Sequence, residues 1–593
     1  MNRYRSHHCG ELRASDVGST VHVSGWVHIT RDHGGLVFID LRDHYGLTQC
    51  VVTPGEGAFA NFSAPSAESV ITVRGEVVPR SPDTINAKLP TGEVEVHAES
   101  IEILAPAGPL PMPVAMEQDY PEETRLRYRY LDLRRAQLHQ NVVLRSKVVA
   151  RMRELMTEQG FLEIHTPILS RTSPEGARDF VVPSRLYPGR FYALPQAPQI
   201  FKQLLMSGGF DRYFQIAPCF RDEESRADRS PGEFYQLDVE MAFVEQQDVF
   251  DAVGPVMEQI FREFSEKPVS SYPFSQITYR DAMLRFGCDK PDRRNPILIS
   301  DVSHVFANSG FTVFKKAVEA GSIIRAVPAP GAASRSRRFF DTLVSRAMEE
   351  GSKGLAYLNF QTEEPKGPVA KHLEAEQVSE LRSITGVGPG DAVFFVCAEK
   401  PEAERLSAWL RGQLGEELEL IDRDRFDLCW VVDYPMFELS DEGKIEFSHN
   451  PFSMPQGGME ALDSDSPLET LAHQYDLVCN GIELSSGAIR NHRPDVMARA
   501  FEIAGYPQER LEADFGGMLE AFRLGTPPHG GIAPGVDRIV MLLCDEPNIR
   551  EVIAFPLSQR AEDLMLGAPA ELDETRLAEL HLRIRKAGKN RTS

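Results

Sequence analysis

The stretch FRDEESRADRSPGEFYQLDVEMAF, residues 220–243, decides how this chain folds. Acids and arginines crowd its first half, which we expect to form a turn between two strands. In a strand, alternate residues share a side, so Phe234, Gln236, Asp238 and Glu240 lie on one face. Polar groups on a buried face need partners, so a strand that faces a ligand is more economical than a core strand. We therefore predict a hairpin that lines a binding site.

The turn itself carries side chains suited to a metal-chelated polyphosphate. Arginine matches the charge and geometry of phosphate, and carboxylates are the ligands that Mg²⁺ prefers. A surface hairpin crowded with salt bridges is the alternative, and the stretch alone leaves it open.

A glycine-rich segment, GTPPHGGIAPGVDRIVMLL (525–543), is the second candidate. Its glycines let the backbone approach a ligand closely, and Arg538 falls in the first turn of an apolar helix that begins near Val536. Between the two segments lie four further polar stretches, SPEGARDF (173–180), LPQAPQIFKQLLM (194–206), SHNPFS (448–453) and YDLVCNGIELSSGAIR (475–490). None has a Ser-His-Asp order or a zinc-type cluster, so together they predict a binding cradle without a protein nucleophile.

Length and composition favour a large folded protein. A chain of 593 residues with 42% hydrophobic and 25% charged residues is long enough for three or four domains. Its formal charge of −23 argues against indiscriminate binding to nucleic acid or anionic membranes. No apolar run approaches the roughly 18 residues of a membrane helix, and no signal peptide is apparent. Eight scattered cysteines without C-x-x-C spacing suggest reduced thiols, so we expect a cytoplasmic protein.

The succession of β-rich, proline-rich and mixed α/β stretches along the chain predicts an α+β protein of several domains. Short β-rich runs over 1–104 fit an OB-fold barrel, and the proline-rich APAGPLPMP begins a linker. The expected divisions are 1–104 for the barrel, 105–125 for the linker, 126–284 and 416–572 for two parts of one domain, 285–415 for an inserted α/β domain and 573–593 for a C-terminal helix and tail.

A basic strip interrupts this acidic chain. From Arg125 to Arg151, seven arginines and one lysine face a single acid, Asp132. The strip is either a solvated helix face or a nucleic-acid contact, and the sequence does not choose between them.

Taken together, these motifs resemble the class II aminoacyl-tRNA synthetases. FRDEE followed by EFYQLD resembles their second signature motif, GIAPGVDR the third and GFLEIHTPIL (160–169) the first. SPEGARDF, LPQAPQIFKQLLM and HGGLVFIDLRD are similar to the bacterial-type aspartyl-tRNA synthetases over essentially the whole chain. The resemblance implies an antiparallel class II sheet flanked by helices, an N-terminal OB-fold barrel that reads the anticodon, and a homodimer.

The resemblance also implies roles for individual residues. Aspartate would be bound by Glu175, Gln199, Lys202, Arg221, Asp238, His449 and Arg490. ATP would be bound by Arg221, Asp222, Glu223, Phe234, Glu483, Gly535, Val536, Asp537 and Arg538, and Mg²⁺ by Asp476 and Glu483. The anticodon would be contacted by Arg31, His33, Phe38, Gln49 and Glu93.

The activity implied is ATP-dependent ligation of L-aspartate to tRNA(Asp) through an aspartyl-adenylate. His33 resembles the residue of enzymes that also charge tRNA(Asn), where strict relatives tend to have leucine. Two alternatives are a strictly tRNA(Asp)-specific enzyme and an inactive, synthetase-like RNA-binding protein. A lysyl enzyme would call for acids where Lys202 and Arg490 stand.

Overall fold

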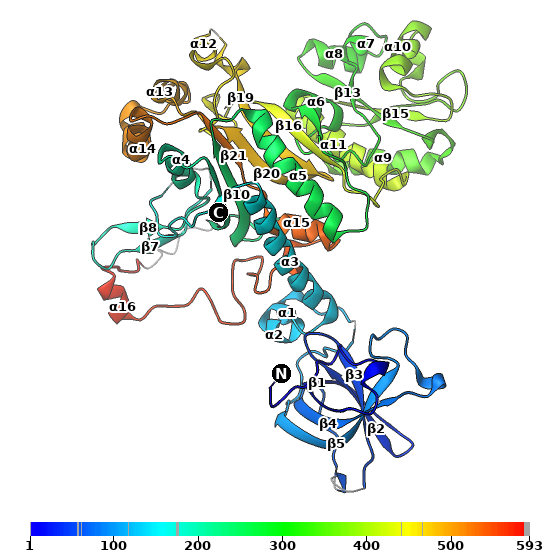
Figure 1. Ribbon diagram of the computed structural model, residues 1–593. Coiled ribbons are helices and arrows are strands. Elements are labelled where there is room, and N and C mark those ends of the chain that lie inside the picture. The colour runs from blue at the N-terminus through cyan, green and yellow to red at the C-terminus, as the bar shows by residue number, and fades with distance from the viewer. Residues whose placement is uncertain are drawn as a thin grey trace. The chain divides into compact units, whose positions relative to one another are not determined.

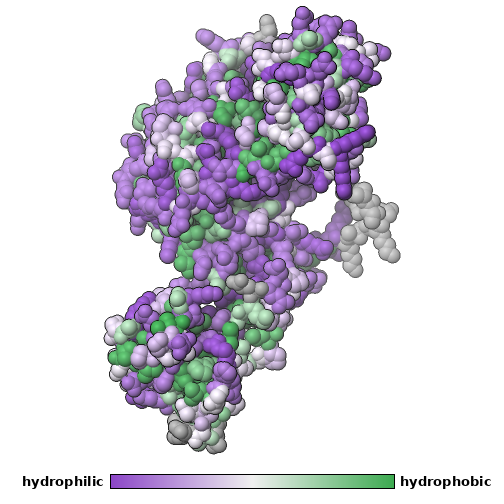
Figure 2. All heavy atoms as spheres, turned by 90° about the vertical axis from the view of Figure 1, so that its right-hand side faces the viewer, coloured by the Kyte–Doolittle hydropathy of each residue, from purple (hydrophilic) through white to green (hydrophobic). Residues whose placement is uncertain are grey.

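A computed structural model describes residues 2–55, 59–60, 62–116, 118–172, 177–440, 442–464 and 466–585. The chain divides into two compact units. The first contains residues 1–140, 554–558 and 562–570, and the second contains the remainder. Within the described residues, no helix is both long and apolar enough to cross a membrane. Hydrophilic side chains predominate on the face drawn in Figure 2, as expected for a strongly charged chain.

A closed five-stranded barrel forms the core of the first unit, which confirms the predicted OB-type barrel (Figure 1). Alternate residues of its strands, such as Val21 and Val23, point into a fully buried core because the side-chain period of a strand is two. In barrel order the strands are β1 (Thr20–His33), β2 (Leu36–Arg42), β3 (Leu47–Val52), β5 (Val94–Ala105) and β4 (Val70–Pro79).

The basic strip begins in two short helices, α1 (Glu122–Arg127) and α2 (Arg129–Asp132), and its arginines have intramolecular partners. The buried carboxylate of Asp132 forms ion pairs with three arginines, which are Arg125, Arg129 and Arg135. Arg134 lies 3.0 Å from Glu68 and over the Trp26 ring. These four arginines therefore tie the unit together.

An eight-stranded sheet organises the second unit (Figure 1). Its strand pairs are antiparallel except at β11–β16 and β6–β9, which confirms the predicted antiparallel sheet. In order across the sheet the strands are β11 (Ser275–Thr278), β16 (Leu428–Pro435), β19 (Leu471–Cys479), β20 (Ile482–Ile489), β21 (His529–Ile532), β10 (Gly232–Ala242), β9 (Arg212–Arg221) and β6 (Leu162–Glu163).

Three helices bury the apolar face of this sheet. They are α3 (Ala136–Glu158), α5 (Gln246–Phe264) and α15 (Val536–Leu543), which contribute to one core with strands β10, β16 and β19. Phe250 of α5 stacks on Trp430 of β16 with ring centroids 4.0 Å apart. On the other side of the sheet, β16 and β19 pack Cys429, Val431 and Val478 against Ala282, while β10 and β20 present polar side chains. Further elements are β7 (Val181–Pro183), β8 (Phe191–Ala193), α4 (Gln199–Ser207), β17 (Phe437–Leu439), β18 (Ile445–Phe447), α12 (Gly458–Leu462), α13 (Pro494–Ile503), α14 (Gln508–Arg523) and α16 (Glu574–Glu579).

Between β11 and β16 the chain builds a second, four-stranded sheet, which lies within the segment expected to be an inserted α/β domain. Its central strands are buried on both faces, since Val327 and Ala326 belong to two different cores. In order its strands are β12 (Ser300–Asp301), β13 (Ile323–Ala329), β15 (Ala392–Ala398) and β14 (Ala356–Asn359). The helices are α6 (Tyr279–Phe286), which precedes it, and α7 (Ser303–Ala307), α8 (Thr312–Glu319), α9 (Arg337–Glu349), α10 (Ala375–Thr385) and α11 (Lys400–Glu417).

Candidate active site

A cavity of about 290 Å³ lies on the polar side of the large sheet. Strands β9, β10 and β20, the first turn of α15, the helix α4 and the loop at 449–452 contribute its walls. Strand β10 contributes Phe234, Gln236 and Asp238 on one face, as the period-two pattern predicts. The hairpin at 220–243 therefore lines this cavity.

Most of the residues assigned to aspartate and ATP meet in this cavity. Its lining includes Gln199, Lys202, Arg221, Glu223, Phe234, Asp238, His449, Glu483, Gly535, Asp537 and Arg538, together with Arg490. Three other assigned residues are absent from the described lining. Asp222 is exposed and donates its backbone N–H to the Arg178 carbonyl, and Val536 lies in the apolar core. Asp476 is buried, and it and Glu483 both form ion pairs with Lys290. Glu175 falls outside the described residues.

The inner end of the cavity holds two buried cations already paired with acids. Arg490 donates two hydrogen bonds to Glu240, at 2.9 and 3.1 Å. The Lys202 ammonium lies 2.6 Å from Asp238 and 3.3 Å from Glu240. Glu240 was placed on the ligand-facing side of the strand but given no role, and the structure shows that it orients both cations. The alternation Asp238, Glu240 was the signal for it.

Burial and pairing act in opposite directions on these two acids. Burial raises the pKa of Asp238, and Lys202 only partly opposes that effect. For Glu240 burial also acts upward, but Arg490 and Lys202 outweigh it and hold the pKa below its ordinary value. Glu240 is therefore the ionised partner of Arg490 and Lys202.

Strand β21 approaches this ion-pair cluster because it carries glycine. A methyl group at Gly531 would lie 2.0 Å from the Val239 carbonyl and 2.2 Å from Glu240 Oε2. Only a residue without a side chain fits between β10 and the buried carboxylate. The glycines of the 525–543 segment thus act at least partly by close packing of strands.

The outer part of the cavity has the features of a nucleotide site. The Arg221 guanidinium lies over the Phe234 ring, 4.9 Å from its centroid, and Glu223 forms an ion pair with Arg229 at 2.6 Å. Arg538 donates to the carbonyls of Glu483 and Asp228, at 2.6 and 3.1 Å. A flat ring beside two arginines can hold an adenine and its phosphates.

Asp537 and Arg538 are adjacent in sequence but have different surroundings. Asp537 accepts hydrogen bonds from the Tyr235 backbone N–H at 2.9 Å and from Arg145 at 2.8 Å. Its carboxylate therefore joins α15 to β10 and α3. A role in binding ATP, which the motif suggested, remains a prediction for this residue.

Asp476 and Glu483, the expected metal ligands, share one cation in the structure. Lys290 Nζ lies 2.5 Å from Asp476 Oδ2 and 3.3 Å from Glu483 Oε2. Asp476 Oδ1 is buried and has no hydrogen-bond partner among the described residues. Two carboxylates and an unsatisfied oxygen fit a divalent cation whose other ligands come from phosphate and water. The described residues contain no group of three or more His, Cys, Asp or Glu side chains placed to hold a metal without such help. No sequence signal pointed to Lys290.

On the barrel, three of the predicted anticodon residues come together. Arg31 and Phe38 face each other across β1 and β2, and Arg31 Nη2 lies 3.3 Å from the Gln49 side chain. Two acids that the sequence did not single out orient them, since Asp40 pairs with Arg31 at 2.6 Å and Glu95 accepts from Gln49 at 2.8 Å. Two further predicted residues are exposed, His33 at the end of β1 and Glu93 just before β5.

His529, which is buried near Glu240, should make the stability of the folded protein depend on pH. Burial lowers its pKa from 6.5 to about 4, so the folded protein keeps the ring neutral. The contribution of the neutral His529 ring to the free energy of unfolding is fully present above pH 6.5. It is lost as the pH falls from 6.5 towards 4, which lowers the free energy of unfolding by about 3 kcal/mol in total. We expect His529→Gln to make the acid-side fall in melting temperature shallower, as followed by circular dichroism. Parallel curves for the variant and the parent would contradict this.

Comparison with known proteins places the chain in a family. The family model "tRNA synthetases class II (D, K and N)" matches residues 121–559, and the model "OB-fold nucleic acid binding domain" matches residues 21–104. The "Aspartate--tRNA(Asp/Asn) ligase" of Acidiphilium cryptum is 60% identical over 586 residues, which is 98% of each chain. The protein of the same name from Zymomonas mobilis is 58% identical with the same coverage.

Solved structures share the fold at much lower identity. Asparaginyl-tRNA synthetase from Pyrococcus horikoshii complexed with asparaginyl-adenylate matches with a TM-score of 0.56 and 20% identity, covering 93% of this chain and 97% of its own. A putative aspartyl-tRNA synthetase from Leishmania major has a TM-score of 0.58 and 19% identity, covering 94% of both chains.

Proposed function

The chain belongs to the class II tRNA synthetases of the D, K and N group, and we propose that it joins L-aspartate to tRNA(Asp) and to tRNA(Asn) at the expense of ATP. It is an aspartate–tRNA ligase that works through an aspartyl-adenylate. The cytoplasm is its proposed place of action.

The pair of buried cations at the inner end of the cavity, Arg490 and Lys202, is the observation that supports aspartate as the amino-acid substrate. Arg490 is 2% exposed and held in place by Glu240, so its charge and fork are fixed before a ligand enters. Lys202, also buried, adds a second positive charge. A site built for a carboxylate leaves these cations poorly paired when an amide enters, so asparagine is rejected at the binding step.

The first chemical step needs no protein nucleophile. A carboxylate oxygen of aspartate attacks the α-phosphorus of ATP, the bond to the β-phosphate oxygen breaks, and pyrophosphate leaves. Arg221 holds the attacking carboxylate and the α-phosphate, Phe234 supports the adenine, and Arg538 covers the other face of the base and reaches the phosphates. A Mg²⁺ held through Asp476 and Glu483 supplies further neutralisation of the phosphates when ATP is bound. A terminal hydroxyl of the tRNA then attacks the adenylate carbonyl and AMP departs.

The remaining contacts of the aspartate involve smaller groups. His449 is exposed beside the cavity and closes over the bound substrate, while Gln199 and Asp238 hold its ammonium together with Glu175. Ala197 and Ser230 also line the cavity.

The barrel selects the tRNA. Phe38 stacks on an anticodon base, and Arg31 and Gln49, fixed by their acidic neighbours, form hydrogen bonds to base edges. His33 is exposed on the hairpin between β1 and β2 and reads the last anticodon base, at which the two tRNAs differ.

A homodimer is supported by apolar side chains in the stretch that resembles the first signature motif. Leu162, Ile168 and Leu169 are 54%, 48% and 54% exposed. Apolar groups clustered on one segment are typical of a surface that another chain covers.

Aminoacylation with [³H]aspartate and Mg²⁺-ATP, run in parallel on tRNA(Asp) and tRNA(Asn) transcripts, tests this function. We expect both to be charged, and we expect His33→Leu to lower kcat/KM for tRNA(Asn) at least tenfold, since a lost base contact is worth about 1–3 kcal/mol. Charging of tRNA(Asp) should change little. Charging of tRNA(Asp) alone by the parent enzyme would support the strictly specific alternative, and charging of neither would support the inactive RNA-binding one.

A further inference from the structure

The connector that enters the inserted domain places a lysine between the two carboxylates assigned to the metal. Lys290 follows α6 and reaches Asp476 on β19 and Glu483 on β20, far away in the sequence. Tyr434 OH also donates to Asp476 Oδ2, at 2.8 Å. The ammonium is therefore a resident cation between two acids that would otherwise repel each other. A metal could share these same oxygens with the ammonium only against strong charge repulsion.

Asp289, the preceding residue, gives the lysine a third carboxylate partner. Its carboxylate lies 2.7 Å from Lys290 Nζ, and its side chain is 30% exposed. Lys290 can thus leave Asp476 and Glu483 while it remains paired. An unpaired, partly buried ammonium would be much less favourable.

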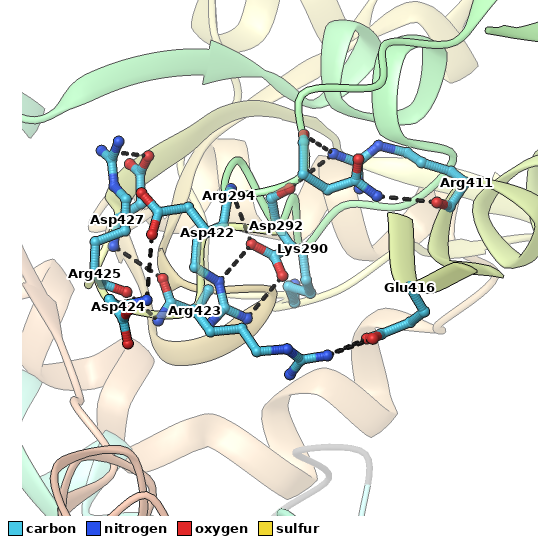
Figure 3. Close-up of polar contacts among 12 residues, drawn as sticks. Lys290, Asp292, Arg294, Arg411, Glu416, Asp422, Arg423, Asp424, Arg425 and Asp427 are labelled. Carbon is cyan, nitrogen blue, oxygen red and sulfur yellow. Dashed lines mark hydrogen bonds and ion pairs between the residues drawn. The ribbon is translucent and has the colours of Figure 1, made fainter. Parts of the chain in front are cut away.

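The backbone around Lys290 is fixed to α11 of the inserted domain. A methyl group at Gly287 would lie 2.7 Å from the Glu404 carbonyl, so the connector packs directly on that helix. Beyond Lys290, Arg411 of α11 donates to the carbonyls of Asp292 and Asn295, each at 2.7 Å (Figure 3).

The same connector also packs against the hairpin that carries the carboxylates. A methyl group at Gly481, in the turn between β19 and β20, would lie 3.1 Å from the Asp292 side chain. Asp292 is held by Arg294 through two hydrogen bonds, at 3.0 and 2.9 Å (Figure 3). The connector thus joins the metal carboxylates to the inserted domain.

We propose that Lys290 is a positioning residue that occupies the cation position between Asp476 and Glu483 in the nucleotide-free enzyme, and that it leaves these two carboxylates and keeps its ion pair with Asp289 when ATP binds with its metal. This rests on the proposed function, in which the two carboxylates hold Mg²⁺. Metal alone is kept out by the ammonium, and the movement of Lys290 transmits nucleotide binding to the base of the inserted domain.

Binding of Mn²⁺ to the nucleotide-free, full-length protein tests the first part, with free Mn²⁺ followed by electron paramagnetic resonance. We expect Lys290→Met to gain one site that binds Mn²⁺ at least tenfold more tightly than any site of the parent. The added substitution Asp476→Asn should remove that site. Because no nucleotide is present, the result does not depend on aminoacylation, and failure of the proposed function would appear separately in the charging assay.

Lys267→Met is the charge-matched control, since Lys267 pairs with Asp545 away from the cavity. Equal Mn²⁺ binding by the Lys290 and Lys267 variants would overturn the proposal. Hydrogen exchange on the parent protein gives a second test that needs no variant. A non-hydrolysable ATP analogue with Mg²⁺ should change amide exchange in residues 288–295 at least threefold, and unchanged exchange with the analogue bound would overturn the coupling.

Discussion

Replacing Arg490 with leucine is expected to lower aspartate-dependent ATP–pyrophosphate exchange at least about 1000-fold in kcat/KM for aspartate. The substitution removes a fixed bidentate donor for the substrate carboxylate, and each factor of ten corresponds to about 1.4 kcal/mol. Among the described residues it also leaves the buried Glu240 with Lys202 as its remaining ion-pair partner, which should lower the melting temperature. Steady-state exchange and thermal denaturation measure the two effects.

A double variant separates activity from folding. Arg490→Leu with Glu240→Gln removes the unpaired buried charge, so we expect it to recover much of the stability but none of the exchange activity. Arg490→Lys keeps the charge without the fork and should fall between the parent and Arg490→Leu. Exchange within tenfold of the parent for Arg490→Leu would contradict the assignment of this residue to aspartate.

The second large effect is expected at Arg538. Arg538→Ala should lower kcat/KM for ATP in the exchange reaction about 100- to 1000-fold, because a preorganised cation beside the phosphates is lost. The side chain is held by two backbone carbonyls and by two longer, partly exposed ion pairs, with Asp228 at 3.3 Å and Glu483 at 3.9 Å, which contribute little to stability. Its loss should therefore change the melting temperature little.

Asp537→Asn is the matched control at the adjacent position. Asp537 ties the Tyr235 backbone and Arg145 together, so we expect a loss of stability of about 2 kcal/mol with nearly normal exchange per folded molecule. A variant that stays fully stable but loses ATP binding would show that Asp537 acts in the site directly. Measuring both variants under the same conditions decides between these roles.

Much of the fold was predictable because it depends on local periodicity. The five β-rich runs close into a barrel, and the strand at 232–242 presents Phe234, Gln236 and Asp238 on one face. Most of the residues that the motif match named also lie in the cavity lining. These features follow from which residues are neighbours in a strand or turn, and neighbours in sequence fix that.

Other features depended on contacts between distant segments. The sequence left the basic strip open, and the structure shows Arg134 paired with Glu68 and three arginines gathered on Asp132. Asp132 lies within the strip and was visible in the sequence, whereas Glu68 is 66 residues away from Arg134 and was not. Electrostatic partners are set by distance in space, which spacing along the chain does not report.

The sequence by itself determined the barrel and the polar face of the strand at 234–240 through local periodicity, and its family resemblance implied the antiparallel sheet and most of the residues that line the cavity. Only the tertiary structure decided which charges are paired. Arg490 with Glu240, Asp537 with Arg145, and Lys290 with Asp476 all join segments far apart in the chain. A buried charge is stable only beside a partner, so the folded packing of those segments assigns each residue its role.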